Sequence, residues 1–469
     1  MPIFNDISNS FSNNTAVITD TGEKFSYYDV ANLGIEIYSK INHRCLVFCL
    51  CQNTIESLSG YISFLSNSIV PLMLDASLEK SMLRDLISLY NPEFLWLPSC
   101  RADEYTEFEI VYSLMNYSLV RLNNRVFQSL NENLALLLTT SGSTGSPKLV
   151  RLSYENIQAN AESIASYLQL SANERPITSL PMHYSYGLSV INSHLISGAT
   201  ILLTDRSIAQ KEFWTFTREQ KATSMAGVPY TYEMLKRLRF FRMSLPDMKV
   251  LTQAGGKLSS SLVQEYVDNA KLSDKKFIVM YGQTEATARM SYLPFESASD
   301  KASSIGIAIP GGKFKLIDDN GSEIAESVKD GELIYLGKNV SLGYADCKED
   351  LIKGDENKGM LYTGDIARRD DDGFYYITGR KKRFIKIYGN RVNLDAAEQI
   401  VKEVTASCAC VGIDDKMLIY ITDSSKADQI RNLLSEKTGL NSRAFEVRVI
   451  EEIPKNTSGK VLYSNLLNE

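Results

Sequence analysis

LLLTTSGSTGSPKLV, at residues 136–150, is the stretch that decides the fold. An apolar run typical of a buried strand leads into a loop of glycine and hydroxyl residues that ends at Lys148. Glycines let successive backbone N–H groups point inward and form an anion nest, to which hydroxyls add donors and the lysine adds charge. The loop residues predicted to hold a polyphosphate are Thr140, Ser141, Gly142, Ser143, Thr144, Gly145 and Lys148.

A flexible Ser/Gly linker is the alternative interpretation of this loop. A linker rarely joins a buried strand to a well-patterned helix, and such a helix is expected from Ser153 onward. The loop also differs from a Walker P-loop, because Leu149 rather than Ser or Thr follows Lys148.

Apolar runs alternate with helical patterns on both sides of the loop. The buried strands predicted upstream lie at 46–52, 69–75 and 94–98, and those predicted downstream lie at 199–205, 222–229, 248–256 and 277–285. A helix is predicted at 77–90, with Ser77 as its N-cap. Strands that alternate with helices predict parallel α/β layers.

The pattern changes at about residue 303. Short alternating runs broken by Gly and Asp-Asn-Gly predict an antiparallel β unit, and helical patterns at 394–404 and 426–437 predict a smaller α+β segment after it. We therefore expect an α/β protein with a large N-terminal domain at 1–379, built from layered α/β sub-domains plus the β unit. A small C-terminal α+β domain is expected at 384–469.

Composition excludes several classes of protein. The chain has 469 residues, of which 44% are hydrophobic and 23% charged, which excludes global disorder, collagen and a coiled coil. Its net charge is -6, so the chain as a whole lacks the excess of basic residues that is typical of nucleic-acid-binding proteins. The N-terminus shows no signal-peptide pattern, and no apolar run reaches the ~18 residues of a membrane span, so a cytoplasmic protein is expected.

The seven cysteines are predicted to be structural and reduced. Cys45, Cys49 and Cys51 share one short apolar run, and Cys408 alternates with Cys410 in another. This spacing fits the buried faces of strands better than a metal site.

VMYGQTEATA, at residues 279–288, is the second candidate site. At the end of its predicted strand, the Tyr281 ring can stack on a base, Thr284 can donate to a phosphate, and Glu285 is an oxygen ligand suited to Mg²⁺. A purely structural strand-to-helix turn is the alternative interpretation.

Two further motifs carry single candidate residues. Asp365, in YTGD at 362–365, can accept hydrogen bonds from both hydroxyls of a ribose, and Arg380 can pair with phosphate or ribose oxygens. Lys460 lies in PKNTSGK at 454–460. The alternatives are an ordinary turn residue for Asp365 and a solvated lysine for Lys460.

Taken together and in this order, the motifs resemble those of the adenylate-forming superfamily, which includes acyl-CoA synthetases, adenylation domains of peptide synthetases and luciferases. The matching motifs are TTSGSTGSPK (139–148), YGQTEA (281–286), GELIYLG…SLGY (331–344), YTGD (362–365), GRKKRFIKIYGNRV (379–392) and PKNTSGK (454–460). They span residues 139–460, and their fixed order makes coincidence implausible.

The resemblance implies a two-step reaction. A carboxylate attacks the α-phosphorus of ATP and expels pyrophosphate, and a thiol of CoA or of a carrier protein's phosphopantetheine then takes the acyl group. It implies catalytic roles for Lys148, Thr284 and Glu285, the last with Mg²⁺, and places Lys460 between the carboxylate and the α-phosphate. The residues that it implies around the nucleoside are Gly255, Gly256, Tyr281, Gly282, Gln283, Asp365 and Arg380.

The resemblance also implies that the C-terminal domain is a mobile lid that rotates between the two half-reactions. Its hinge would be residues 380–383, with Lys382 at the pivot, and Gly389 would line the pantetheine channel. The alternative for the four basic residues at 380–383 is a nuclear or nucleic-acid-binding patch.

Residues 181–199 resemble the substrate segment of acyl-CoA ligases. The residues expected to line the acyl pocket are His183, Tyr186, Met225 and Gly227. Peptide-synthetase domains usually carry an Asp near the start of this segment to pair with an ammonium group. None is present here, which favours a small carboxylic acid without an α-amino group.

The leading hypothesis is a stand-alone ligase that joins a carboxylic acid to a thiol with ATP and Mg²⁺. Two alternatives stay open: an enzyme that loads an amino acid onto an acyl carrier protein, and a non-catalytic relative that only binds nucleotide. A short lid would favour the carrier protein over CoA. No nucleic-acid partner and no membrane span are expected.

Overall fold

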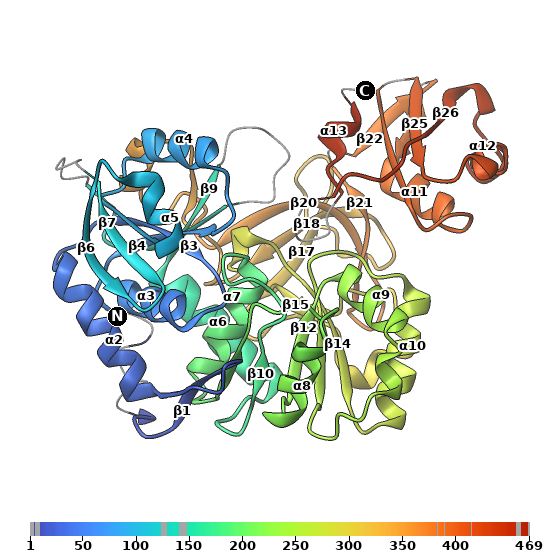
Figure 1. Cartoon of the computed structure of the whole chain (residues 1–469). Helices are drawn as coiled ribbons and strands as arrows, with labels where there is room; N and C mark the ends of the chain where they lie inside the picture. The colour runs from blue at the N-terminus through green and yellow to red at the C-terminus, as the bar shows by residue number, and fades with distance from the viewer. Residues whose placement is uncertain are drawn as a thin grey trace.

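Two large sheets, with helices packed on their faces, form most of the molecule (Figure 1). The structure is a computed structural model that describes residues 4, 10–122, 129–139, 148–381, 383–388, 390–413, 415–455 and 461–467. Parallel strands lie at the centre of both sheets, as the alternation of strands with helices predicts.

The first sheet is parallel in the middle and antiparallel at its edges. Its strand order is β19 (Gly343–Ala345), β9 (Leu149–Ser153), β8 (Leu134–Thr139), β4 (Val70–Asp75), β3 (Leu46–Cys51), β5 (Phe94–Pro98), β7 (Tyr117–Arg121) and β6 (Glu109–Leu114). The parallel pairs are β8–β4, β4–β3 and β3–β5.

The second sheet has the same plan. Its strand order is β16 (Ile307–Ala308), β15 (Ser291–Tyr292), β14 (Lys276–Tyr281), β13 (Val250–Gln253), β12 (Ser224–Gly227), β10 (Pro176–Ile177), β11 (Ile201–Leu203), β1 (Thr15–Thr19) and β2 (Lys24–Ser26). The strands from β14 to β1 run parallel, so their carboxyl ends lie along one edge.

Three apolar cores hold these sheets in five layers. The core between the sheets also takes side chains from α2 (Tyr27–Ile41), α3 (Ile55–Ser66), α6 (Tyr154–Leu168) and α7 (Ser185–Leu195). The outer face of the first sheet is covered by α4 (Lys80–Tyr90) and α5 (Ser99–Ala102). The outer face of the second sheet is covered by α8 (Lys211–Glu219), α9 (Pro229–Arg237) and α10 (Ser260–Leu272).

The β unit predicted from about residue 303 is present as an antiparallel sheet. Its strands are β17 (Lys313–Ile317), β18 (Gly331–Leu336), β20 (Met360–Arg369) and β21 (Tyr375–Arg380). The YTGD motif lies within β20, and Arg380 is the last residue of β21. The antiparallel register of these two strands places Asp365 directly opposite Arg380.

A small unit with its own core follows at one end of the molecule (Figure 1). Its elements are β22 (Phe384–Ile387), β23 (Asn390–Asn393), α11 (Leu394–Lys402), β24 (Cys408–Ile413), β25 (Lys416–Ile421), α12 (Ala427–Thr438), β26 (Phe445–Val449) and α13 (Tyr463–Leu467). The helices predicted at 394–404 and 426–437 are confirmed.

The predicted strands are confirmed in both large sheets, but one predicted helix start is wrong. Ser77 does not cap α4, which begins at Lys80 after Glu79. The hydroxyl of Ser77 instead donates to Asp75 Oδ1 at 2.7 Å, because a carboxylate just past β4 captures the next polar groups in a turn. The start predicted at Ser153 is confirmed, with Asn156 completing a capping box.

The cysteines follow the structural interpretation. Cys45, Cys49 and Cys51 are buried in the core between the sheets, and Cys408 and Cys410 are buried in the small unit. All seven cysteines are free thiols. Among the described residues, no helix has the length and apolar character needed to cross a membrane.

Candidate active site

The end of β14 meets the β20–β21 hairpin at the carboxylate of Asp365. The Tyr281 hydroxyl donates to Asp365 Oδ2 at 2.5 Å, and Gln283 Nε2 donates to the same oxygen at 3.1 Å. Arg380 donates from Nε to Asp365 Oδ1 at 3.2 Å. Four residues predicted to surround a nucleoside are therefore in direct contact.

Asp365 is a buried acid in this group, with only 3% of its surface exposed. Burial raises the pKa of Asp365 above its ordinary value, although Arg380 and the hydrogen bonds from Tyr281 and Gln283 oppose this shift. The Arg380 side chain is 53% exposed. A buried acceptor beside a half-exposed guanidinium can bind a ligand that offers adjacent hydroxyls and an anionic group.

Gly282 lies where the chain passes close to its own continuation. A Cβ atom at this position would lie 1.7 Å from the carbonyl oxygen of Ala288 and 2.6 Å from the carbonyl carbon. Both atoms belong to the backbone, so no side chain fits without moving the chain. This approach explains the glycine of the YGQTE motif and holds η3 (Thr284–Ala286) against the sheet.

Thr284 connects the site to the start of α7. Its hydroxyl oxygen lies 3.0 Å from that of Ser185, the first residue of the helix. The motif and the segment predicted to bind the acid are therefore joined by a direct polar contact. Ser185 was not predicted as a site residue, although it lies in the HYSYG stretch beside His183.

Glu285 and Lys148 approach the same tyrosine from different sides. The Tyr344 hydroxyl donates to Glu285 Oε1 at 2.8 Å, and Lys148 Nζ lies 4.2 Å from the centre of the Tyr344 ring. Lys148 also lies 4.0 Å from Asp346. An exposed cation and a carboxylate are thus gathered at one place, as phosphate and Mg²⁺ binding require.

The sheet register positions Tyr344. β19 pairs antiparallel with β9, which places Tyr344 opposite Val150, two residues after Lys148. The fully buried Arg151 donates to the backbone carbonyls of Leu342 and Tyr344 and to Glu356 Oε2. These hydrogen bonds fix the position of the SLGY segment at 341–344. The SLGY motif was part of the family resemblance, but Tyr344 was missed as a site residue because a tyrosine has many structural uses.

Gly255 and Gly256 follow β13 and face aromatic and proline side chains. A Cβ at Gly255, whose φ is +82°, would lie 2.5 Å from the hydroxyl oxygen of Tyr184. A Cβ at Gly256 would lie 3.1 Å from Pro229 Cγ. Burial raises the pKa of Tyr184 to about 12. Tyr184 is a further residue of this site that was not predicted.

The residues predicted for an acyl pocket divide between two cavities. His183 lines a cavity of about 330 Å³ beside Asp75 and Cys51, at the carboxyl ends of β4 and β3. His183 Nε2 is 3.8 Å from Asp75 Oδ2, and burial lowers the pKa of His183. Met225 lines a different cavity, between α7 and the second sheet.

Tyr186 and Gly227 lie near the second of these cavities. The Tyr186 hydroxyl donates to the Thr252 carbonyl at 2.8 Å, and Thr252 lines the cavity. Gly227 ends β12, where a Cβ would lie 2.9 Å from side-chain atoms of Thr231 and Tyr232. The structure therefore groups Tyr186, Gly227 and Met225 around the second sheet, apart from His183.

Several predicted site residues lie outside the described residues, and their assignments stay predictions. They are Thr140, Ser141, Gly142, Ser143, Thr144, Gly145, Lys382, Gly389 and Lys460.

The basic run at 380–383 is engaged in ion pairs. Beside Arg380, Lys381 Nζ donates to Glu332 at 2.6 Å, and Arg383 Nε donates to Asp395 at 2.5 Å. Each basic residue that the structure describes in this run thus faces a carboxylate. A nucleic-acid-binding patch needs cations free to meet phosphates, so these contacts argue against that alternative.

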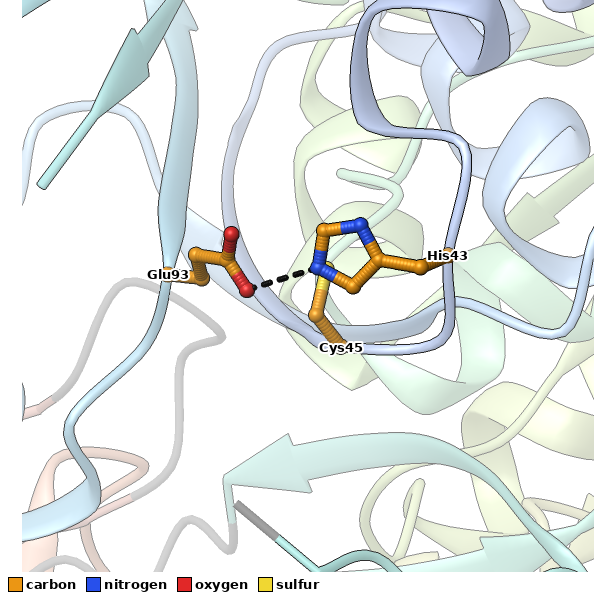
Figure 2. A group of neighbouring side chains, drawn as sticks. All are labelled: His43, Cys45 and Glu93. Carbon is orange, nitrogen blue, oxygen red and sulfur yellow. Dashed lines mark hydrogen bonds and ion pairs between the residues drawn. The ribbon is translucent and has the colours of Figure 1, made fainter. Parts of the chain in front are cut away.

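A separate group of possible metal ligands lies at the amino ends of β3 and β5 (Figure 2). Ligand atoms of His43, Cys45 and Glu93 are within 4.8 Å of one another, and His43 Nε2 lies 2.8 Å from Glu93 Oε2. Burial raises the pKa of the Cys45 thiol, which disfavours the thiolate that metal binding requires. We interpret the group as an ion pair beside a buried thiol, in line with the structural role predicted for Cys45.

Comparison with known proteins identifies related sequences. Residues 40–345 match the family of AMP-binding enzymes. The long-chain-fatty-acid–CoA ligase of Salmonella typhimurium is 28% identical over 371 residues, which span 72% of this chain and 62% of that ligase. The 2-succinylbenzoate–CoA ligase of Bacillus licheniformis is 28% identical over 345 residues, which span 71% of this chain and 70% of that ligase.

Solved structures match the whole fold. The o-succinylbenzoate CoA synthetase (MenE) of Bacillus subtilis, in complex with the acyl-adenylate intermediate OSB-AMP, has a TM-score of 0.82 and 20% identity, covering 100% of this chain and 98% of that chain. ATP-bound MatB from Rhodopseudomonas palustris has a TM-score of 0.81 and 19% identity, covering 99% of this chain and 98% of that chain. The likeness confirms the predicted α/β fold with its small C-terminal unit.

Proposed function

The chain belongs to the AMP-binding enzyme family, and we propose that it uses ATP to activate a carboxylic acid as an acyl-adenylate and then transfers the acyl group to the thiol of CoA. The observation that carries the proposal is that the turn at residues 281–285 joins two groups of side chains. Asp365, Arg380, Tyr281 and Gln283 form one group, and Glu285, Lys148 and Tyr344 form the other. The names of the related CoA ligases support CoA as the acceptor.

In the first step, an oxygen of the substrate carboxylate attacks the α-phosphorus, and the bond to the pyrophosphate oxygen breaks. Asp365 accepts hydrogen bonds from the ribose hydroxyls. Lys148 and the glycine- and hydroxyl-rich loop at 140–145 bind the β- and γ-phosphates. In this proposal, Lys460 supplies the positive charge that lowers the repulsion between the two reacting anions. Such transfers depend mainly on positioning and on neutralising charge, which these residues supply.

In the second step, the CoA sulfur attacks the acyl carbon, and AMP leaves with the electrons of the acyl–oxygen bond. We propose that residues 384–469 act as a lid that rotates about residues 380–383, with Lys382 as the pivot and Gly389 beside the pantetheine arm. The separate apolar core of this unit supports a rigid-body movement. We also propose a reducing, cytoplasmic location for the protein, which the seven free thiols of the whole chain support.

The donor set at Glu285 fits Mg²⁺. Glu285 is a half-buried carboxylate that accepts one hydrogen bond from Tyr344, and the Thr284 hydroxyl precedes it. Mg²⁺ usually binds through one or two carboxylates together with substrate phosphates, so Glu285 would hold the ion against the nucleotide. When bound, Mg²⁺ supplies positive charge that offsets the phosphates.

Replacing Glu285 with Gln is expected to raise the Mg²⁺ concentration needed for half-maximal activity by about 10-fold or more, because a neutral amide is a weaker ligand. Pyrophosphate release measured across a Mg²⁺ titration tests this. Tyr344→Phe is the matched control, since it removes one hydrogen bond to Glu285 but keeps the carboxylate, and we expect a smaller shift. An unchanged Mg²⁺ dependence in Glu285→Gln would contradict the metal assignment.

Replacing Asp365 with Asn is expected to raise the KM for ATP by about 10-fold or more, because charge-assisted hydrogen bonds to the ribose are weakened. The protein should not lose stability at pH 7. Burial raises the pKa of Asp365 in the folded state, so its ionised form destabilises the fold at any pH above that raised value.

The pH dependence of unfolding tests the second half of this prediction. As pH falls through the raised folded-state pKa towards the ordinary value of 3.8, the carboxyl becomes protonated and the two proteins should converge in stability. Asp371→Asn, an exposed change on the same hairpin, is the control. A lower unfolding temperature for Asp365→Asn at pH 7 would show that the ion pair with Arg380 outweighs the cost of burial.

The overall proposal is tested by pyrophosphate release with ATP and Mg²⁺ over a panel of fatty, aryl, hydroxy and amino acids, with and without CoA. Release that depends on the carboxylic acid establishes acyl-adenylate formation, and stimulation by CoA identifies the acceptor. Activity confined to amino acids and unaffected by CoA would favour the carrier-loading alternative. ATP binding without release for any acid would favour a non-catalytic nucleotide-binding protein.

A further inference from the structure

Arg289 is a buried cation next to the cavity that Met225 lines. Only 1% of its surface is exposed. Its Nε donates to the Ser189 hydroxyl at 3.1 Å, and its Nη1 donates to the Tyr167 hydroxyl at 3.1 Å. The Tyr186 ring lies 5.1 Å from the guanidinium carbon. These contacts fix the guanidinium beside the cavity but bring no negative charge to it.

Within the described ranges, no carboxylate forms an ion pair with Arg289, and Nη2 makes no hydrogen bond. A buried charge without a partner is costly, and proteins usually neutralise it. The fully buried Arg151 shows the usual solution, since its guanidinium contacts Glu356. The difference between the two buried arginines indicates that the partner of Arg289 is a bound molecule.

His194 is a second polar group at the same cavity that lacks a partner. Its Nδ1 lies 2.8 Å from the Val190 carbonyl, which can only accept, so this nitrogen carries the proton. Its Nε2 is buried and has no hydrogen-bond partner in the part of the chain that the structure describes. Burial lowers the pKa of His194 to about 4, so Nε2 offers a lone pair at neutral pH. At neutral pH Nε2 needs a donor, such as a water molecule or a hydroxyl of the substrate, whereas a carboxylate is an acceptor and fits Arg289.

The helix α7 connects the proposed reaction centre to the cavity, because its first residue contacts Thr284 and its last turns line the cavity. Ser185, at the start of the helix, contacts Thr284, Ser189 contacts Arg289, and His194 lines the cavity. At 1.5 Å per residue, Ser189 and His194 lie about 6 and 13.5 Å from Ser185 along the helix axis. The cavity volume is about 60 Å³. That is close to the space of two water molecules, and it suits the end group of a substrate.

The cavity is also lined by two charged residues of opposite sign that are less buried than Arg289. They are the half-buried Glu174 and the exposed Lys249. The Glu174 carboxylate already has a partner, because it accepts a hydrogen bond from the Thr223 hydroxyl at 2.7 Å. The uncompensated charge of the cavity therefore lies at Arg289, which is its buried cation.

We propose that the acid activated by this protein carries a second carboxylate, which accepts hydrogen bonds from Arg289 while the first carboxylate reacts beside Thr284. The inference rests on the proposed acid-activating function and specifies its substrate class. Arg289 is a specificity residue in this reaction, because it contacts the non-reacting end of the substrate. A site built around a polar group also rejects analogues that lack the group, since its own buried polar atoms are then left unpaired.

The test compares straight-chain dicarboxylic acids of about four to ten carbons, which bracket the distances along α7, with monocarboxylic acids of the same length. The wild-type protein should use the best diacid with a kcat/KM at least ~10-fold above that of its matched monoacid. Arg289→Met should remove this preference, and Lys249→Met, which removes the exposed cation of the same cavity, should keep it. The mono-amide of the best diacid should behave as the monoacid does.

Calorimetric titration of the diacids without ATP separates this inference from the proposed function. Diacid binding that is lost in Arg289→Met supports the carboxylate site even if no acid is ever adenylated. Monoacids or the mono-amide used as well as diacids by the wild-type protein would overturn the inference while leaving acid activation intact. Thermal unfolding of Arg289→Met, and of Arg289→Lys as a charge-conserving variant, shows whether a loss of preference reflects misfolding.

Discussion

Lys460→Ala is expected to lower the rate of acyl-adenylate formation by about 100- to 1000-fold, the usual effect of removing one pre-organised charge from a reaction centre. The reason is electrostatic. A carboxylate and an α-phosphate must approach each other, and the proposed position of Lys460 between them offsets their repulsion. ATP binding should change little, because the residues proposed to hold the nucleoside, Asp365, Arg380 and Tyr281, contact one another outside the lid.

The measurements are acid-dependent pyrophosphate release and, separately, ATP affinity by calorimetry. Lys455→Ala is the matched control, because Lys455 is an exposed lysine of the same PKNTSGK motif, and it should behave as wild type. A second assay supplies preformed acyl-adenylate with CoA, and there Lys460→Ala should retain most of its thioester formation. Near-normal adenylation by Lys460→Ala would show that the assignment of the lid lysine is wrong.

Gly282→Ala is the second change with a large expected effect. The added Cβ would lie 1.7 Å from the Ala288 carbonyl oxygen, so the backbone on one side must move. Movement of about 1 Å at Thr284 and Glu285 is enough to lower a reaction rate by about 100-fold. Overpacking of this kind also costs about 1 to 3 kcal/mol of folding stability.

Gly354→Ala is the control for this change, because a Cβ there meets nothing within 4 Å. It should alter stability by no more than about 0.5 kcal/mol and leave activity unchanged. Thermal unfolding and adenylation rates of both variants give the comparison. Normal adenylation in Gly282→Ala would mean that the YGQTE turn is not part of the reaction centre.

The site residues could be predicted from the sequence because each motif follows or ends a strand and contains side chains that suit one kind of ligand. YGQTE and YTGD lie far apart in the chain, yet Tyr281, Gln283 and Asp365 were all predicted and are in direct contact. The strands around them were also predictable, since buried runs bounded by turns have few other structures open to them. Ser77 shows the limit of local patterns. Its backbone N–H and hydroxyl both donate to the Asp75 carboxylate at the end of the preceding strand, so Ser77 does not cap the helix.

By itself, the sequence determined the α/β class, the order of the motifs and the chemistry expected at the strand ends, because these depend on local periodicity and residue type. Only the tertiary structure decided which side chains outside the predicted sites contact the predicted site residues or line the same cavity. Tyr344 reaches Glu285 through the pairing of β19 with β9, and Arg289 and His194 meet one cavity because α7 packs on the second sheet. Whether a buried charge has a partner depends on contacts between distant segments, which no local pattern contains.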